Sequence, residues 1–433
     1  MYMDSLISKI YPIFLKNPVV STDSRQVQPG SLFFALKGES FNGNEFAALA
    51  LKHGAAYAIV DEPKYADNDR FILVKDVLST LQEMARHHRL QFNIPVIAIT
   101  GSNGKTTSRE LINSVLSKKY RTLATKGNLN NHIGVPLTLL SINAETDLAI
   151  IEMGANHPGE IDFLCRIAYP NFGLITNIGK AHLEGFGSFE GVIRTKTELS
   201  NFLKDRDGIM FLNNGDELLK IHVECPNIFT YGTPPADVAL LNVVSDPFVK
   251  MEIGFSDKSQ IFIESNLYGS YNAGNILSAA CIGQQFSISP EEIKTAIEEY
   301  HPGNNRSQIL KTDHNLLILD AYNANPSSME AALTMFAETT YIKKMVILGD
   351  MLELGNEADH EHRQILGLLD HLKFQQVFLV GNIFTRLNTN RENICFHDTD
   401  LARMWLEHHK IENSTILVKG SRGIKLEKLV ESL

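Results

Sequence analysis

Short apolar runs alternate with amphipathic stretches along the middle of the chain. Runs typical of buried parallel strands occupy residues 94–99, 122–124, 148–153, 173–177 and 209–212. Between them, apolar residues recur at helical spacing from Lys105 onward, over 160–168 and over 189–203. Because strands and helices alternate with short links, the pattern predicts an α/β region built on a doubly wound parallel sheet.

A smaller unit precedes this central region. Residues 21–36 combine a polar loop, a Pro-Gly turn and a strand, and residues 38–43 form a second polar loop. A helix is predicted over 46–53, where Gly54 ends it, and a strand over 58–60. A further helix over 78–92 leads into the central region.

The pattern changes again after the central region. Residues 237–268 alternate between apolar and polar without helices, which predicts an antiparallel appendage, and helices follow over 271–286 and 290–300. A third α/β unit begins near Arg306, with helices between its strands. Those strands are predicted at 316–319, 345–348, 377–380 and 415–418.

Length and charge narrow the classes of protein. A chain of 433 residues is too long for one core and predicts two to four domains. The formal net charge of −10 argues against a nucleic-acid partner. No apolar run has membrane-spanning length, and Met1 to Lys16 predicts an amphipathic helix rather than a signal peptide. With four scattered cysteines, these features lead us to expect a cytoplasmic protein without membrane insertion.

The segment from Thr100 to Thr107, here called the phosphate loop, follows a strand and opens a helix. Gly101 and Gly104 allow a sharp turn that aims backbone N–H groups at phosphate oxygens. Lys105 can neutralise phosphate charge, and the Thr106 hydroxyl can bind magnesium. The spacing departs from the standard pattern, because Ile99 stands where the first glycine would fall. The alternative is a tight turn without a ligand, but Lys-Thr-Thr at the start of a helix favours nucleotide binding.

Polar residues after the other central strands suggest a larger site. Glu152 ends a strand beside the phosphate loop and is a candidate magnesium ligand. His182, in the polar segment that begins at Thr176, could ligate a metal, orient a phosphate or make a structural hydrogen bond. Lys196 has the pattern of a solvated helix lysine. Asn272 and Asn275 share a helix face and could contact adenine, although helix capping is the favoured reading from the residues alone.

Three polar loops follow strands of the third unit, at 320–326, 349–355 and 419–423. The last of them is basic and suits a carboxylate or a phosphate. Because ligands of open α/β sheets lie beyond the carboxyl ends of the strands, we expect these loops to converge on a site.

Together, these residues resemble the Mur ligase family, the ATP-dependent enzymes that form amide bonds in peptidoglycan assembly. The phosphate loop, Glu152, the segment from Thr176 to His182, the pair Asn272 and Asn275, and Arg306 occur in the family's order. Residues 127–136, 322–326, 348–355 and 419–422 resemble more narrowly the member that takes D-alanyl-D-alanine as its amine. The resemblance covers essentially the whole chain.

The resemblance implies three domains and a set of small-molecule partners. Residues 1–85 would bind the UDP end of the substrate, 86–304 would form a central P-loop ATPase, and 305–433 would form a Rossmann-like ligase domain. The implied substrates are ATP, a UDP-N-acetylmuramoyl-tripeptide and D-alanyl-D-alanine, with an acyl-phosphate intermediate and two magnesium ions. A monomer is expected.

The resemblance also assigns roles to individual residues. Catalytic roles fall to Lys105, Glu152, His182 and Lys196, and the metal ligands would be Thr106, Glu152, His182 and a carbamylated Lys196. ATP contacts are implied for Gly101, Ser102, Asn103, Gly104, Lys105, Thr106, Thr107, Asn272, Asn275, Arg306 and Asp320. Substrate contacts are implied for Ser24, Arg25, Asn130, Asn131, Asn323, Asn325 and Arg422. In the segment from Ala35 to Phe46, the sequence departs from the family, because Asn42 and Asn44 stand where Asp and His are expected.

Three alternative functions are weighed against this reading. Within the class, the chain could be the ligase that adds the third peptide residue or a folylpolyglutamate synthetase. The Asn-Ala-Asn-Pro segment at 323–326 argues against both. From another class, a nucleotide-switch protein would hydrolyse ATP slowly and independently of muramoyl peptides.

Overall fold

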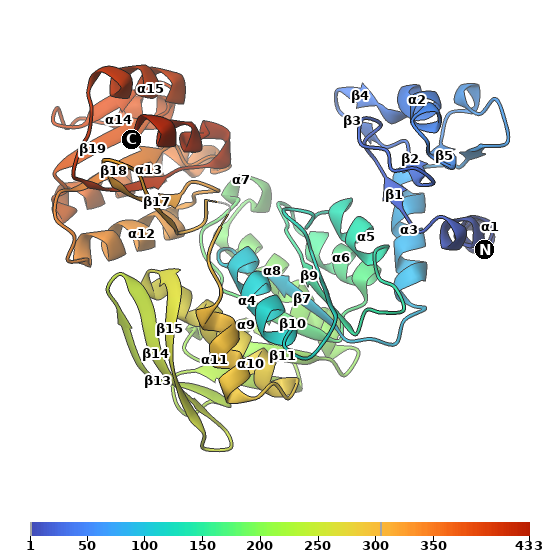
Figure 1. Cartoon of the computed structure of the whole chain (residues 1–433), viewed down its shortest axis with the longest axis horizontal. Coiled ribbons are helices and arrows are strands. Elements are labelled where there is room, and N and C mark those ends of the chain that lie inside the picture. Colours follow the sequence, from blue (N-terminus) through green and yellow to red (C-terminus); the bar gives the residue numbers. More distant parts are fainter. Residues whose placement is uncertain (1, 304) are drawn as a thin grey trace.

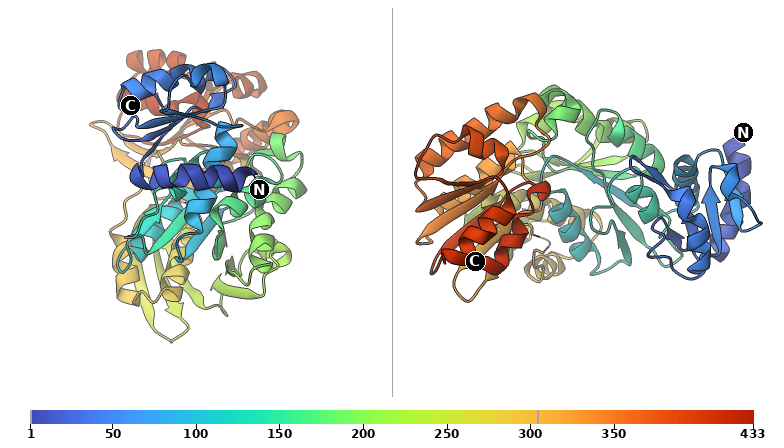
Figure 2. Two further views of the ribbon diagram at one scale, coloured as in Figure 1. Left: turned by 90° about the vertical axis from the view of Figure 1, so that its right-hand side faces the viewer. Right: turned by 90° about the horizontal axis from the view of Figure 1, so that it is seen from above.

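The computed structural model describes residues 2–303 and 305–433. Three α/β units form an arch, with the N-terminal and C-terminal units at opposite ends of the central one (Figures 1 and 2). This arrangement confirms the predicted α/β class. In the described part of the chain, no helix combines the length and the apolar character needed to cross a bilayer.

The N-terminal unit contains a four-stranded parallel sheet in the order β1-β2-β5-β6. Its predicted loop at 38–43 contains a two-stranded hairpin. The helix predicted over 46–53 is confirmed as α2 (Ala47–Lys52), and a 3₁₀ turn (Gly43–Phe46) precedes it. The Asn42 side chain accepts a hydrogen bond from the Asn44 N–H and caps that turn. The elements are α1 (Tyr2–Lys16), β1 (Val20–Ser21), β2 (Leu32–Phe34), β3 (Lys37–Gly38), β4 (Phe41–Asn42), α2 (Ala47–Lys52), β5 (Tyr57–Val60), a 3₁₀ turn (Pro63–Tyr65) and β6 (Phe71–Leu73).

Helix α3 (Val77–Arg89) joins the N-terminal unit to the central unit. Its N-cap, Asp76, accepts a hydrogen bond from the Ser79 N–H at 2.6 Å. The helix packs against α1 on one side and against α5 and α6 on the other. The boundary expected at residue 85 therefore lies inside a helix that both units share.

The central unit is built on a nine-stranded sheet in the order β15-β14-β13-β12-β11-β10-β7-β9-β8. Each pair of neighbouring strands from β8 to β13 is parallel. The last two pairs, β13 with β14 and β14 with β15, are antiparallel. The antiparallel strands predicted over 237–268 are therefore confirmed, and β12, a strand that the pattern did not predict, joins them to the central sheet by pairing with β13. The strands are β7 (Val96–Thr100), β8 (Thr122–Ala124), β9 (Leu148–Glu152), β10 (Phe172–Ile175), β11 (Ile209–Asn213), β12 (Asn227–Gly232), β13 (Val238–Ser245), β14 (Phe248–Phe255) and β15 (Gln260–Tyr268).

Helices cover both faces of this sheet, which confirms the doubly wound arrangement. Along β7, Val96 and Ala98 join the core cluster beneath α3, α5, α6 and α8, while Ile97 and Ile99 join the one beneath α4, α10 and α11. The helices are α4 (Lys105–Leu116), α5 (Gly134–Leu139), α6 (Glu160–Ala168), α7 (Leu183–Phe186), α8 (Phe189–Lys204), α9 (Glu217–His222), α10 (Ala273–Gln285), which follows a 3₁₀ turn (Ser270–Asn272), and α11 (Pro290–Glu298).

The C-terminal unit is a six-stranded sheet in the order β16-β17-β21-β18-β19-β20. The four predicted strands are parallel, and two short strands that the pattern did not predict lie at the edges, with β16 antiparallel to β17. The elements are β16 (Gln308–Lys311), β17 (Leu316–Asp320), α12 (Pro326–Glu338), β18 (Lys344–Gly349), α13 (Ala358–Leu372), β19 (Gln376–Val380), α14 (Asn382–Leu387), β20 (Ile394–Phe396), α15 (Thr399–His408), β21 (Thr415–Lys419) and 3₁₀ turns at Gly355–Glu357, Arg422–Ile424 and Leu426–Ser432.

His88 lies at the junction of α1, α3 and the segment after α5. Its Nδ1 lies 2.9 Å from the Tyr11 hydroxyl, its Nε2 lies 2.8 Å from the carbonyl oxygen of Ile142, and its side chain is buried. Burial lowers the pKa of His88 below its ordinary value of 6.5.

This burial predicts a loss of stability in acid. Above pH 6.5 His88 is neutral in the folded and in the unfolded protein. As the pH falls below 6.5, the unfolded chain binds the proton before the folded protein does, which favours unfolding. The urea midpoint should therefore fall from pH 7 to pH 5 more steeply for the wild type than for His88→Gln, followed by circular dichroism. Equal slopes for the two proteins would contradict the assignment.

Candidate active site

A cavity of about 750 Å³ lies where the central and C-terminal units face each other. Its walls are formed by the phosphate loop, the loops after β9 and β10, the start of α10, the loops after β17 and β18, and the end of β21. All predicted site residues line this cavity except Gly101, Lys196, Arg422, Ser24 and Arg25.

The phosphate loop is held by contacts that leave no room for larger residues. Gly101 has a φ of 142°, and a β-carbon there would lie 2.0 Å from the Thr176 hydroxyl. A β-carbon at Gly104 would lie 2.5 Å from the Asn275 Oδ1. The N–H of Asn103 donates to the Asn177 Oδ1 at 3.0 Å. Since α4 begins at Lys105, its first N–H groups have no partners within the helix, which is the arrangement that binds anions.

Lys105 lies along this loop. Its Nζ donates to the carbonyl oxygens of Gly101 at 2.6 Å and Ser102 at 3.2 Å. Burial, together with the nearby charge of Arg306, lowers the pKa of Lys105 to about 8, although the Glu152 carboxylate acts in the opposite direction. A multiply charged phosphate beside Lys105 would favour the ammonium form.

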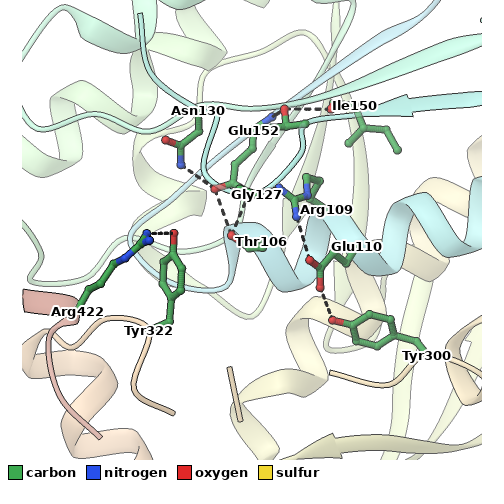
Figure 3. A network of polar contacts seen from close by, with 11 residues as sticks. Thr106, Arg109, Glu110, Gly127, Asn130, Ile150, Glu152, Tyr300, Tyr322 and Arg422 are labelled. Carbon is green, nitrogen blue, oxygen red and sulfur yellow. Dashed lines mark hydrogen bonds and ion pairs between the residues drawn. The ribbon is translucent and has the colours of Figure 1, made fainter. Parts of the chain in front are cut away.

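Glu152, at the end of β9, is the centre of a buried polar network (Figure 3). Its carboxylate accepts hydrogen bonds from the Thr106 hydroxyl at 3.0 Å and the Asn130 amide at 2.8 Å. Arg109 Nη1 lies 3.2 Å from the same carboxylate and donates to the carbonyl oxygen of Gly127. The sequence analysis did not identify Arg109. Its position one helical turn after Lys105, on the same face of α4, could have indicated that it lies near the site.

The network continues away from the cavity. Arg109 Nη2 lies 2.9 Å from the Glu110 carboxylate, which in turn accepts a hydrogen bond from the Tyr300 hydroxyl at 2.5 Å. Only 5% of the Arg109 side chain and 2% of the Glu152 side chain are exposed. The buried arginine therefore offsets two carboxylates at once, which makes it a structural requirement of the site.

The donor set fits magnesium rather than a metal held by protein alone. The described residues contain no cluster of three His, Cys, Asp or Glu side chains that could hold a metal ion. Magnesium commonly uses one or two carboxylates and completes its coordination with water and substrate phosphates. Adjacent Glu152 and Thr106 beside a phosphate loop provide such oxygen donors.

Asn272 and Asn275 meet at the start of α10. The Asn275 amide donates to the Asn272 Oδ1 at 2.8 Å and its own Oδ1 accepts from the Ser108 hydroxyl at 3.0 Å. Asn272 makes no side-chain capping hydrogen bond, so the capping interpretation is wrong. Both side chains are largely buried and line the cavity.

His182 and Lys196 both lie beside the ring of Phe186. His182 lines the cavity and its Nδ1 lies 2.6 Å from the Glu353 carboxylate of the C-terminal unit. Lys196 is buried, with its Nζ over the Phe186 ring at 5.3 Å, so the prediction of a solvated helix lysine is wrong. Burial, and secondarily the charge of Lys105, lower the pKa of Lys196 well below its ordinary range.

The C-terminal wall carries a cationic group around Tyr322. The Arg306 guanidinium lies 3.6 Å from the centre of the Tyr322 ring, and Arg422 Nη1 donates to the Tyr322 hydroxyl at 3.3 Å (Figure 3 shows the second contact). Asp320 is paired with Lys419 at 2.5 Å. Arg306 Nε is buried and has no hydrogen-bond partner among the described residues, so a bound anion could satisfy it.

Asparagine side chains bridge the two walls and border the cavity. Asn325 caps α12 through its Oδ1 and donates through its Nδ2 to the Asn103 Oδ1 at 2.8 Å. Asn323 is exposed to the cavity, and the Asn131 Oδ1 accepts from the Gly134 N–H at 2.9 Å. The C-terminal unit therefore contacts the phosphate loop directly.

The predicted UDP contacts lie in the N-terminal unit, away from this cavity. Arg25 pairs with Asp23 at 2.7 Å, and the Ser24 carbonyl oxygen lies 2.9 Å from His53 Nδ1. Asn42 and Asn44, the departures from the family pattern, belong to a polar network. Asn42 donates to Glu62 at 2.9 Å and Asn44 donates to Asp61 at 2.8 Å. The structure does not bring these residues together with the phosphate loop.

Three family models match the chain in the order of its units. They are described as Mur ligase family, catalytic domain (residues 18–89), Mur ligase middle domain (99–283) and Mur ligase, glutamate ligase domain (305–422). The UDP-N-acetylmuramoyl-tripeptide–D-alanyl-D-alanine ligase of Bacillus subtilis is 36% identical over 426 residues, covering 96% of this chain and 92% of that one. The Escherichia coli enzyme of the same name is 34% identical over 429 residues, covering 96% and 93%.

Solved structures of enzymes of the same kind are also similar to this chain. A crystal structure of MurF from Acinetobacter baumannii has a TM-score of 0.86 at 31% identity, covering 96% of this chain and 92% of that one. The MurF ligase of Thermotoga maritima in complex with ADP has a TM-score of 0.84 at 25% identity, covering 96% and 97%.

The Arg109 network predicts a large stability effect. Arg109→Met would leave the buried Glu152 carboxylate without its cation, so the free energy of unfolding should fall by about 3–5 kcal/mol. Denaturant unfolding measures the change. The matched control is Arg121→Met, because Arg121 pairs with Asp147 at the surface and should contribute less than about 1 kcal/mol. A similar loss for both variants would contradict the role assigned to Arg109.

Proposed function

Because the chain belongs to the Mur ligase family, we propose that it joins D-alanyl-D-alanine to a UDP-N-acetylmuramoyl-tripeptide with ATP as the energy source. The product is the UDP-muramoyl-pentapeptide used in peptidoglycan synthesis, and ADP and phosphate are released. The observation that carries this proposal is that relatives of that name match 96% of the chain. In agreement with it, the phosphate loop faces residues of the C-terminal unit across one cavity.

The terminal carboxylate of the tripeptide is a poor electrophile, so it must be activated before an amine can attack it. The terminal carboxylate of the tripeptide attacks the γ-phosphorus of ATP, which breaks the bond to ADP and forms an acyl phosphate. The free amine of D-alanyl-D-alanine then attacks the acyl carbon, and the tetrahedral intermediate expels phosphate as the amide forms. Lys105 and the N–H groups at the start of α4 would stabilise the charge on the phosphates during transfer.

Magnesium would neutralise the negative charge between the carboxylate and the phosphates. Glu152 and Thr106 would hold one ion, and His182 with a carbamylated Lys196 would hold a second. The low pKa of Lys196 supports this assignment, because only a neutral amine adds to carbon dioxide, and burial favours the neutral form. Carbamylation would replace a buried cation by a metal-binding anion.

The C-terminal unit would deliver the amine and complete the site. Arg306 would reach ATP, and Arg422 with Asn323 would bind the dipeptide, whose free carboxylate suits a guanidinium. Asn325 already contacts Asn103 of the phosphate loop. Closure of the two walls would exclude water, which matters because acyl phosphates hydrolyse.

Location and assembly follow from the same proposal. All four cysteines are free, and the substrates are soluble small molecules, so we expect a cytoplasmic monomer. The UDP group would bind in the N-terminal unit near Ser24, Arg25 and the Asn42 and Asn44 network.

A coupled assay of ADP release tests the function. With ATP, magnesium and UDP-muramoyl-tripeptide present, ADP release should require added D-alanyl-D-alanine. Lys105→Ala should lower the rate by about 100-fold or more, because it removes a charge that stabilises the transferred phosphate. Lys118→Ala, which alters a lysine at the surface, should behave like the wild type. Release that ignores both muramoyl peptide and dipeptide would favour a nucleotide-switch protein instead.

The carbamate at Lys196 is tested by chemical rescue. Lys196→Ala should be nearly inactive, and added formate or acetate should restore part of the rate by occupying the space of the missing carbamate. Lys105→Ala in the same buffers should not respond, because its missing group is a cation. Absence of rescue in Lys196→Ala would count against the carbamate.

A further inference from the structure

We propose that Glu353 is a positioning residue that orients the His182 ring for metal binding. The proposal rests on the function proposed above, since it concerns the second metal site of that reaction. It adds a residue from the C-terminal unit to a site otherwise built on the central unit.

The contact joins two loops from different units. His182 lies after β10 of the central unit, and Glu353 lies after β18 of the C-terminal unit. The distance between His182 Nδ1 and Glu353 Oε2 is 2.6 Å. Both residues have positive φ angles, 50° for His182 and 64° for Glu353, which are costly for residues other than glycine. The surrounding structure thus holds both loops in the positions that make the contact.

The burial of the ring determines which nitrogen is available. Nδ1 is buried, and no described residue makes an aligned hydrogen bond to it. The group beside it is the Glu353 carboxylate, which forms an ion pair with the ring when the ring is protonated. The His182 side chain is nevertheless 23% exposed, and it lines the cavity. The accessible part of the ring therefore excludes Nδ1 and includes the edge that carries Nε2.

A carboxylate beside Nδ1 has a defined chemical effect. It favours the tautomer that carries the proton on Nδ1, which leaves the Nε2 lone pair free for a metal. The same pairing increases the basicity of the ligand and restricts rotation of the ring. Because Glu353 belongs to the C-terminal unit, the metal site reaches its binding geometry only when that unit docks.

A second ion pair across the same interface makes it possible to distinguish two roles for Glu353: orienting the His182 ring, or only holding the two units together. Lys180 Nζ lies 2.7 Å from the Glu361 carboxylate, so this pair also joins the central and C-terminal units. Its lysine has no lone pair for a metal while it is charged. If Glu353 served only to hold the two units together, loss of Glu361 would have the same consequence.

Binding of Mn²⁺ in place of Mg²⁺ tests the proposal. The full-length protein is saturated with a non-hydrolysable ATP analogue, and Mn²⁺ is titrated by electron paramagnetic resonance. Spin-echo modulation from a directly bound ¹⁴N then identifies the ion at His182. In Glu353→Ala, the affinity for this nitrogen-coupled ion should fall about 10- to 100-fold. Glu353→Gln should retain most of the affinity, because its amide oxygen can take the place of the carboxylate oxygen beside Nδ1. Glu361→Ala should match the wild type.

Four results would overturn the proposal. They are the absence of a nitrogen-coupled ion in the wild type, wild-type affinity in Glu353→Ala, equal losses in Glu353→Gln and Glu353→Ala, and an equal loss in Glu361→Ala. The third would make Glu353 a direct ligand and the fourth would make it a docking contact. Since 56% of the Glu353 side chain is exposed, the variants should fold. Failure of the proposed function would appear separately, as wild-type ADP release that does not depend on D-alanyl-D-alanine.

Discussion

The carboxylate of Glu152 is buried at the end of a parallel strand, and the site depends on how its charge is satisfied. Thr106, Asn130 and Arg109 surround it, and they come from the phosphate loop, the segment before α5 and helix α4. A buried carboxylate is tolerated only with such partners. The same interaction therefore holds three segments of the central unit in register and keeps a metal-binding acid beside the phosphate loop. Arg109 extends the constraint to Glu110 and Tyr300, near the point where the chain leaves for the C-terminal unit.

The other half of the site is assembled by contacts between units. Asn325 reaches Asn103, Lys180 reaches Glu361, and His182 reaches Glu353. Each contact joins a loop after a strand of the central sheet to the C-terminal unit. The carboxyl ends of the strands of the two sheets therefore face each other across the cavity. A reaction that activates an acid on one wall and brings an amine from the other requires this arrangement.

The elements predicted from the sequence are those with strong local patterns. Helices α4, α6 and α8 begin where their apolar spacing and turn residues indicate, and the four predicted strands of the C-terminal unit are present. Strands β12, β16 and β20 were not predicted. β16 and β20 have only four and three residues, so few residues carry their pattern. The antiparallel strands of 237–268 were predicted, but their connection to the central sheet was not, because β12 makes that connection. The candidate residues of the cavity were largely found, because they follow strands whose ends must meet at one edge.

What the sequence determined by itself is local: the periodicity of strands and helices, the glycines of the phosphate loop and the order of polar loops after the strands. Those features depend on residues close together in the chain. Only the tertiary structure decided which polar groups are buried and which partners they meet. Lys196 has the local pattern of a solvated lysine but is enclosed by packing around α8, and Asn272 pairs with Asn275 rather than capping its helix. Arg109 and Glu353 gain their roles from carboxylate and imidazole groups that lie far away in the sequence, and burial and long-range charge pairing arise only when the chain is folded.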